Sequence, residues 1–178
     1  MKTTIKPFFY ILLIITFLIG YGVQVYAQKK VNITTGIGIP ELLNLGVYYQ
    51  LDQVQMGLSV GSIPVGSDDK LLSISGDVFY HFGGSSELSN RRPWYGRLGL
   101  NYLREETEYS IIKYTHLNIR VGRDLNISTN LGIRLGAGGF FEVIRKEKRK
   151  KPKPSGGLNL NFDVPIIPSL GIGLFYKI

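Results

Sequence analysis

Cysteine is absent from this chain of 178 residues. Disulfide bonds and thiolate metal sites are therefore excluded, and so is a lipid-modified N-terminal cysteine. Histidine is scarce, with only His81 and His116, and neither has clustered acidic residues beside it, which makes a metal site unfavourable. After residue 28, no apolar run is long enough to cross a bilayer as a helix. The hydrophobic residues after residue 28 must therefore belong to something other than a membrane-spanning helix.

The N-terminal segment has the layout of a secretory signal. Two lysines precede an apolar stretch over residues 8–19, and the small residues Val25 and Ala27 follow it. This layout predicts a cleaved signal peptide over residues 1–27 and one mature domain over residues 28–178. An uncleaved membrane anchor is the alternative, but an apolar run of about 12–16 residues is short of the ~20 that a spanning helix needs.

The positive charge of the chain is local. The formal net charge is +8. Removing the two lysines of the predicted signal leaves +6, and the stretch 145–153 alone carries seven basic residues and one acid. The rest of the mature chain is neutral, which argues against a nucleic-acid-binding body and predicts one basic loop. That loop either binds phosphate groups of lipopolysaccharide or an acidic surface polymer, or is merely solvated. Its basic residues are Arg145, Lys146, Lys148, Arg149, Lys150, Lys151 and Lys153.

Apolar and polar residues alternate through most of the mature chain. In residues 43–51, for example, every second residue is apolar, and the intervening ones are Asn44, Gly46, Tyr48 and Gln50. This period predicts an all-β chain with one apolar face. The apolar face would line the interior of a soluble barrel or face lipid in a membrane barrel. Strand lengths of about 9–11 residues, small polar residues on the other face and aromatic residues near strand ends favour the membrane.

Nine alternating segments are visible, whereas a bacterial membrane barrel needs an even number. We expect eight strands, with residues 158–164 extending an arm that begins at residues 140–144; ten strands are the alternative. If the N-terminus is periplasmic, short turns fall on that side and longer loops fall outside. The expected turns are 52–53 and 123–126, the expected outer loops are 64–70, 104–108 and 145–154, and 83–93 is long for a periplasmic turn.

The C-terminal segment carries a more specific pattern. Gly173 is followed three positions later by Tyr176, and the sequence stops at Ile178, where the pattern has an aromatic residue. The segment resembles the C-terminal recognition strand of bacterial outer-membrane barrels. With the predicted signal, the chain resembles a small bacterial outer-membrane β-barrel protein of the outer-membrane-protein β-barrel superfamily. The resemblance implies a closed, antiparallel, up-and-down transmembrane barrel, monomeric, without a cofactor. It also implies contact with outer-membrane lipid, including lipopolysaccharide, and with the barrel-assembly machinery.

Charged residues fall on the polar face of several predicted strands. Asp77, Arg97, Arg120 and Arg134 would all point into a narrow interior, where buried charges must be paired. We therefore predict a charge network that plugs the lumen. The three arginines outnumber the one carboxylate, so other acids, such as Glu142 and Asp163, or bound anions would complete the network.

The function expected from these features is a structural or surface-interaction role for a plugged barrel. A small anion-preferring pore or lumen-binding barrel is one alternative. A second is an outer-membrane lipid-modifying enzyme centred on His116, although the sequence shows no nucleophile motif beside it. A third is a soluble periplasmic barrel of lipocalin type.

Overall fold

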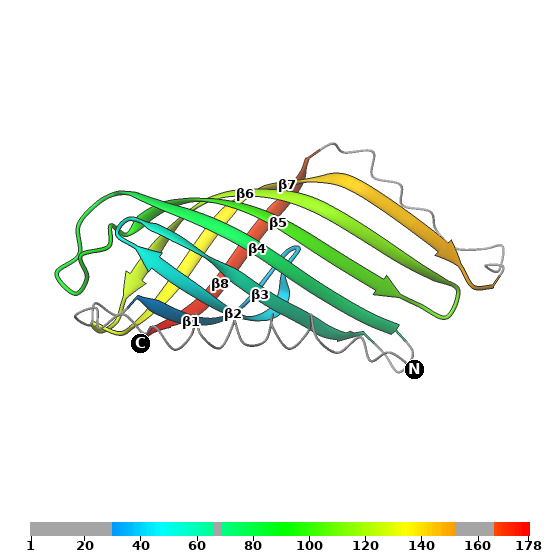
Figure 1. Ribbon diagram of the computed structural model, residues 1–178, viewed down its shortest axis with the longest axis horizontal. Helices are drawn as coiled ribbons and strands as arrows, with labels where there is room; N and C mark the ends of the chain where they lie inside the picture. The colour runs from blue at the N-terminus through cyan, green and yellow to red at the C-terminus, as the bar shows by residue number, and fades with distance from the viewer. Residues whose placement is uncertain (1–29, 66–68, 152–165) are drawn as a thin grey trace, which may run out of the picture.

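The computed structural model describes residues 30–65, 69–151 and 166–178. Eight antiparallel strands form a closed barrel, each pairing with the next along the chain, and β1 pairs with β8 to close it (Figure 1). The strands are β1 (Val31–Gly38), β2 (Leu42–Leu51), β3 (Val54–Val65), β4 (Asp69–Gly83), β5 (Trp94–Glu106), β6 (Ser110–Asn126), β7 (Leu131–Arg149) and β8 (Ile167–Lys177). The expected all-β, up-and-down barrel of eight strands is confirmed. Within the described residues, no helix is long and apolar enough to cross a membrane.

Both ends of the described chain lie at one end of the barrel. The amide of Ile178 donates to the carbonyl of Val31 at 2.8 Å, and the pairing of β1 with β8 runs from there to Gly38 and Gly171. We call this end the near end and the opposite end the far end. The connections at residues 52–53, 84–93 and 127–130 lie at the near end, and the β1–β2 tip at residues 39–41 lies at the far end.

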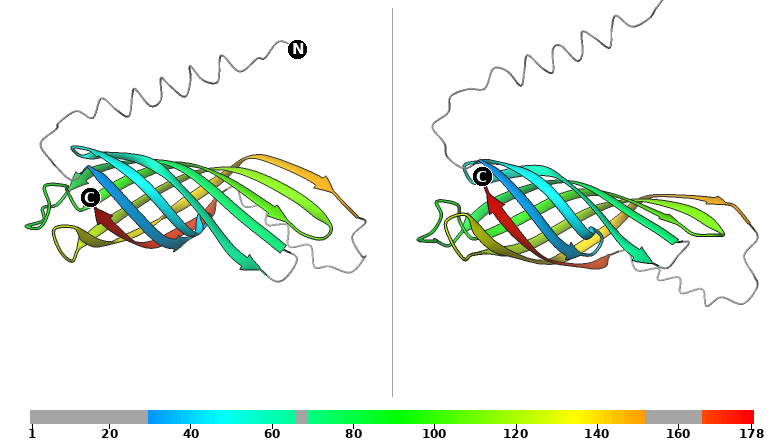
Figure 2. Two further views of the ribbon diagram at one scale, coloured as in Figure 1. Left: turned by 60° about the horizontal axis from the view of Figure 1, so that its bottom comes forward. Right: turned by 90° about the horizontal axis from the view of Figure 1, so that it is seen from below.

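The strands differ in length. β4 to β7 have 15, 13, 17 and 19 residues, whereas β1, β2, β3 and β8 have 8, 10, 12 and 11. The long strands continue beyond the far ends of β1 and β8 as a sheet that projects from one side of the barrel (Figures 1 and 2). We call this projection the arm and define it as residues 69–72, 103–114 and 144–151.

The barrel is apolar outside and polar inside. Large apolar side chains on its outer surface are 36–68% exposed. They include Leu45, Leu58, Tyr80, Leu100, Ile119, Leu135 and Leu174. The inward-pointing side chains are mostly polar and include Gln55, Ser75, Asp77, His81, Asn101, Asn118 and Asp124, all of them buried. A soluble barrel of lipocalin type would have the opposite arrangement, because its apolar face lines the interior.

Glycines on the inner face make room for aromatic side chains. A Cβ at Gly122 would collide with the hydroxyl of Tyr95, and a Cβ at Gly132 would collide with the ring of Phe175. The glycines of the polar face therefore do more than permit curvature. They provide the space in which the lumen is filled.

Three expected loops are strand instead. β5 and β6 stay paired as far as Glu106 and Ile111, so the expected loop 104–108 shrinks to a tight turn at residues 107–109. β6 runs through the expected turn 123–126, and the hairpin turns at residues 127–130. Much of the expected basic loop 145–153 belongs to β7, because residues up to Arg149 pair with β6. Charge indicated exposure in these segments, but an exposed strand can carry charge as well as a loop can.

Some expectations fall outside the described residues. They are the signal peptide over residues 1–27, the segment 158–164 with Asp163, and Lys153.

Candidate functional site: the barrel lumen

An aromatic layer crosses the lumen. The rings of Tyr48 and Phe79 meet edge to face with centroids 5.5 Å apart, and Phe79 meets Tyr95 in the same way at 5.3 Å. Phe175 of β8 is also buried, with 1% of its surface exposed. The four side chains come from β2, β4, β5 and β8, and ion-paired residues lie toward either end of the barrel from them.

The far part holds an ion-paired cluster built on Arg97 and Arg120. Arg97 Nη2 lies 2.7 Å from Asp77 Oδ1 and also 2.7 Å from Glu41 Oε1. Arg120 Nη2 lies 2.6 Å from the other oxygen of Glu41. The Tyr48 hydroxyl donates to Asp77 at 2.9 Å, which ties the cluster to the aromatic layer. We call these four charged residues the far cluster. All four are buried, so each charge depends on its partners for compensation.

Glu41 reaches the lumen because the β1–β2 tip folds inward. Glu41 is only 3% exposed, and Asn118 Nδ2 donates to its carboxylate at 2.7 Å. Arg120 also donates to the carbonyl of Ile39 in the same tip, and Ser169 accepts from Arg120 Nε at 2.5 Å. The tip therefore contributes its own backbone and one carboxylate to the far end of the lumen.

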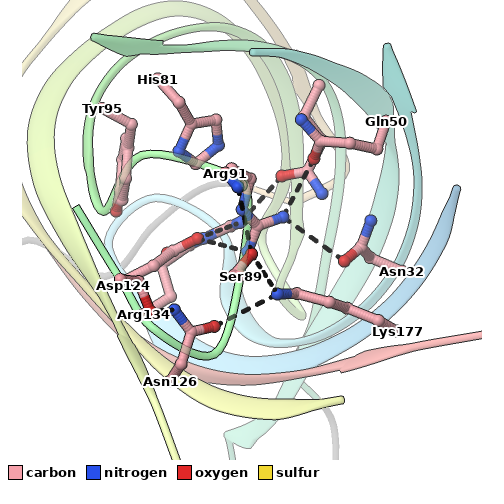
Figure 3. Close-up of polar contacts among 12 residues, drawn as sticks. Asn32, Gln50, His81, Ser89, Arg91, Tyr95, Asp124, Asn126, Arg134 and Lys177 are labelled. Atoms are coloured by element: carbon pink, nitrogen blue, oxygen red, sulfur yellow. Dashed lines mark hydrogen bonds and ion pairs between the residues drawn. The ribbon is translucent and has the colours of Figure 1, made fainter. Parts of the chain in front are cut away.

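The near part holds a second cluster centred on Asp124 (Figure 3). Arg91 Nη2 lies 2.6 Å from Asp124 Oδ2, and Arg134 Nε lies 2.9 Å from Asp124 Oδ1. Arg134 also donates to Gln55 at 2.8 Å, and Arg91 donates to Gln50 at 3.0 Å. We call Arg91, Asp124 and Arg134 the near cluster. The Arg134 guanidinium lies over the ring of Phe79 at 4.3 Å from its centroid, so this cluster packs against the aromatic layer from the near side.

Arg91 belongs to no strand and comes from the connection 84–93. Although it lies in a loop, it is 6% exposed, because the loop enters the near end of the barrel. Lys177 of β8 donates to Ser89 Oγ at 2.8 Å, and the backbone amide of Arg92 donates to Gln53 at 2.9 Å. The unusual length of this connection thus has a structural explanation: it carries Arg91 into the near end of the lumen.

Lumen cations outnumber lumen carboxylates among the described residues. Five cations point inward, namely Arg91, Arg97, Arg120, Arg134 and Lys177. Three carboxylates oppose them, namely Glu41, Asp77 and Asp124. A cavity of about 60 Å³ lies between the far cluster and the inner faces of β1 and β8. A larger one of about 320 Å³ opens at the near end beside Arg91 and Lys177.

The structure separates the charged residues that the sequence predicted as one network. Asp77, Arg97 and Arg120 belong to the far cluster, whereas Arg134 pairs with Asp124 in the near cluster, although it lines the same cavity of about 60 Å³ as Arg97 and Arg120. Glu142 was expected to complete the network but is exposed, so that expectation was wrong. The completing acids are Glu41 and Asp124. Their signal in the sequence was the excess of arginine, which required carboxylates, but Asp124 had been placed in the expected turn 123–126, and Glu41 lies outside the alternating segments.

The two histidines lie among aromatic rings. His81 is buried beside Tyr95, with ring centroids 5.6 Å apart. His116 stacks on Tyr114 at 5.6 Å and meets Phe140 edge to face at 4.9 Å. In the part of the chain that the structure describes, Nδ1 of His116 has no hydrogen-bond partner. No orienting acid therefore holds that ring nitrogen.

The basic stretch is distributed over both faces of the β7 end. Arg145, Lys146, Lys148 and Arg149 lie on the strand itself. Lys150 donates to Glu106 at 2.8 Å and Lys151 donates to Glu108 at 3.0 Å, which fastens this end to the β5–β6 turn. The hydrogen bond from Lys150 is the main reason why the pKa of the Glu106 carboxyl lies below its ordinary value.

The proposed assembly residues lie on the last strand. Gly173 pairs with Gly36 of β1, and its inner side faces the backbone of β1. Tyr176 and Ile178 point outward and are 50% and 57% exposed. These outward side chains lie at the near end, where the barrel closes.

A closed barrel with an apolar outside and an ion-paired polar inside has the architecture of a small outer-membrane β-barrel. No protein-family model matches the chain, and no curated protein matches it. Among solved structures, it is similar to the crystal structure of Neisserial surface protein A. The two are 15% identical with a TM-score of 0.43, over 84% of this chain and 95% of that one.

Proposed function

We propose that this protein is a small barrel of the outer membrane of a diderm bacterium, exported by a signal peptide cleaved from residues 1–27. Its role in this proposal is structural and in surface interaction, with a closed lumen and a charged arm outside the cell. The observation that carries the proposal is the inverted polarity of the barrel. Its strands expose their apolar residues and bury their ion pairs.

The outer surface is too apolar for water. Soluble monomers rarely expose a contiguous apolar patch above about a few hundred Å². Here, exposed leucine, isoleucine, valine and tyrosine side chains occur on every strand around the barrel. Lipid removes this surface from water, and closure of the sheet leaves no unpaired edge within the bilayer.

The lumen supports a structural role more than a transport role. The inward-folded tip with Glu41, the aromatic layer and the inserted Arg91 follow one another between the far and near ends. Each arginine of the two clusters has a carboxylate partner. Opening a path would require several of these buried pairs to separate, and breaking one buried pair costs about 3–5 kcal/mol.

Carbonate extraction followed by gel electrophoresis tests the location and the fold. We expect the protein to stay in the carbonate-washed membrane fraction, and the unboiled sample to migrate differently from the boiled one. Release by carbonate into the periplasmic fraction would contradict the proposal and would favour the lipocalin-type alternative.

A small anion-preferring pore is the second candidate, and the charge excess of the lumen supports it. Five inward cations face three carboxylates in the described residues, and the near-end cavity of about 320 Å³ adjoins Arg91 and Lys177. This function predicts anion-selective conductance steps in planar bilayers. A folded preparation that gives no steps at high protein load would remove it.

Catalysis is not part of the proposal. His116 lies between two aromatic rings, and its buried Nδ1 has no partner in the described residues. Overexpression is therefore expected to leave the lipid A mass profile unchanged. A new lipid A species that disappears in His116→Ala would contradict this expectation.

The last strand is proposed to carry the assembly signal for the barrel-assembly machinery, and the assembled protein is proposed to be a monomer. Tyr176 and Ile178 present exposed side chains at the closing strand, where a receptor can reach them. In cells, Tyr176→Ala should reduce the amount of heat-modifiable protein, whereas Tyr80→Ala removes an exposed aromatic residue elsewhere and serves as the control.

A further inference from the structure

Three cations stand side by side on one face of the arm. The ladder pairs Arg104 of β5 with Lys113 of β6, and pairs Lys113 with Lys146 of β7. Residues that pair across antiparallel strands share a face, and their Cβ atoms lie about 4.5–5.5 Å apart. We call these three residues the cationic row.

The cationic row lies on the outward face, at the edge of the apolar band. One step nearer the barrel on the same face, Tyr102 pairs with Thr115, and Thr115 pairs with Ile144. Ile144 is 48% exposed, as an outward side chain should be. On these three strands, the row therefore holds the first charged outward side chains beyond the apolar surface. At that level a membrane barrel meets the lipid headgroups.

The row lacks compensating charge. Like charges directly opposite each other across a ladder repel. Among the described residues, neither Lys113 nor Lys146 forms an ion pair or a side-chain hydrogen bond. Arg104 donates from Nη2 to Glu106 at 2.8 Å, but Lys150 occupies the same carboxylate, and Arg104 Nε is buried without a partner. One shared carboxylate thus serves two cations, and two lysines have none.

The basic residues of β7 that alternate with Lys146 and Lys148 have an acidic neighbour. Arg145, Glu147 and Arg149 lie on the opposite, inner face of the arm, and both arginines approach Glu147, at 4.0 Å and 3.4 Å. The inner face therefore places Glu147 between its two arginines, whereas the one carboxylate beside the row on the outward face, Glu106, is bound by Arg104 and Lys150 and does not reach Lys113 or Lys146. The basic stretch therefore has two faces. On the inner face the arginines lie near Glu147, and on the outward face Lys146 has no acidic partner among the described residues.

We propose that the cationic row binds the phosphate groups of an anionic lipid in the leaflet that surrounds the far end of the barrel. The inference rests on the proposed membrane location. Phosphate oxygens supply the missing acceptors for the exposed ammonium groups of Lys113 and Lys146. The acyl chains of the same lipid lie against the apolar surface next to Tyr102 and Ile144. A lipid can pair with the cations and cover the adjoining apolar surface with one molecule. A free anion can only pair with the cations.

Spin-label electron paramagnetic resonance of barrels in phosphatidylcholine vesicles tests the proposal. The probes are spin-labelled phosphatidic acid and spin-labelled phosphatidylcholine, and the readout is the fraction of each that is immobilised by the protein. The wild-type protein should prefer phosphatidic acid. Lys113→Gln/Lys146→Gln should lower that preference by about fivefold per lysine at low ionic strength, because each basic side chain near a membrane surface contributes about 1 kcal/mol.

The matched control is Arg145→Gln/Arg149→Gln, which removes two charges from the same end of the arm but from its inner face. It should keep the wild-type preference. Equal losses in both variants, or no loss in either, would overturn the cationic row as a lipid site. Millimolar inorganic phosphate at matched ionic strength should leave the preference intact; its loss would assign the row to soluble phosphate and overturn the lipid proposal.

Heat-dependent gel migration separates this test from the test of the proposed function. Both double variants and the wild type should show the folded band. A wild-type protein without that band would overturn the membrane function itself. A folded wild-type barrel without lipid preference would overturn only the cationic row.

Discussion

The lumen and the arm are both rich in charge, and their charges are held in opposite ways. In the lumen, Glu41 is buried and shared between two arginines, at 2.7 Å and 2.6 Å. In the arm, Glu147 also lies near two arginines, but the contacts are 4.0 Å and 3.4 Å and all three side chains are at least 37% exposed. The same residue types therefore form buried ion pairs in one region and solvent-exposed pairs in the other.

Among the predicted variants, the largest loss in the free energy of unfolding is expected for a substitution of Glu41. Glu41→Gln leaves the buried Arg120 without a carboxylate partner, although Arg97 keeps Asp77, and breaking a buried pair costs about 3–5 kcal/mol. Urea unfolding of the refolded barrel in lipid vesicles measures the change. The control is Glu147→Gln in the arm, where an exposed pair is worth about 0–1 kcal/mol. Similar losses in the two variants would contradict the distinction between the regions.

The second largest loss in the free energy of unfolding is expected for a substitution of Arg91. Arg91→Ala leaves Asp124 with Arg134 as its remaining ionic partner, so the loss should be smaller than for Glu41→Gln, about 2–3 kcal/mol. Unfolding in urea measures this loss as well. Planar-bilayer recording of the same variant should show no new conductance, because the far cluster and the aromatic layer still cross the lumen. Steady current from Arg91→Ala would show that the loop alone closes the barrel.

Combining the two changes sharpens the comparison within the lumen. Glu41 and Arg91 belong to different clusters with different carboxylate–arginine pairs, so the losses in Glu41→Gln/Arg91→Ala should add within about 0.5 kcal/mol if Phe79 does not couple them. Arg97 and Arg134 both lie over the ring of Phe79, at 5.5 Å and 4.3 Å from its centroid. A larger departure from additivity would mean that this ring couples the two clusters.

The smallest effect expected is in the arm, at Glu106. The hydrogen bond from Lys150 lowers the pKa of this carboxyl, so the contact contributes above the ordinary pKa of glutamate and is lost as the pH falls through the lowered value. Carbon-detected NMR titration in micelles should give a lower midpoint in the wild type than in Lys150→Gln. Lys148→Gln removes a charge without touching Glu106 and should leave the midpoint in place. A wild-type midpoint equal to that of Lys150→Gln would show that the contact does not form.

Much of the barrel was predictable because strand alternation is a local signal. The inward or outward direction of Asp77, Arg97, Arg120 and Arg134 follows from the period of two, and the structure places all four in the lumen. The strand ends were harder. Charged residues at 104–106 and 145–149 indicated loops, yet ladder pairing continues through them because a strand outside the bilayer can present charge to water.

The completion of the lumen could not be predicted from alternation. Glu41 and Arg91 enter from a tip and a loop, so no strand period assigns them to a face. Nor could the pattern show that Arg134 pairs in a different cluster, with Asp124, from Arg97, which pairs with Asp77 and Glu41. That separation depends on barrel stagger, which sets which residues of distant strands share a level and is not encoded within any one strand.

Lys177 has a consequence for the order of assembly. It stands on β8, which pairs with β1 to close the sheet, and its ammonium group holds Ser89 of the inserted loop and Asn126 of β6. Before β1 and β8 have paired, β8 is not in its final position, so Lys177 cannot bind Ser89 and Asn126. The contacts of Lys177 with Ser89 and Asn126 therefore form in the same step that pairs β1 with β8, so the loop 84–93 is held in place only when the barrel is complete.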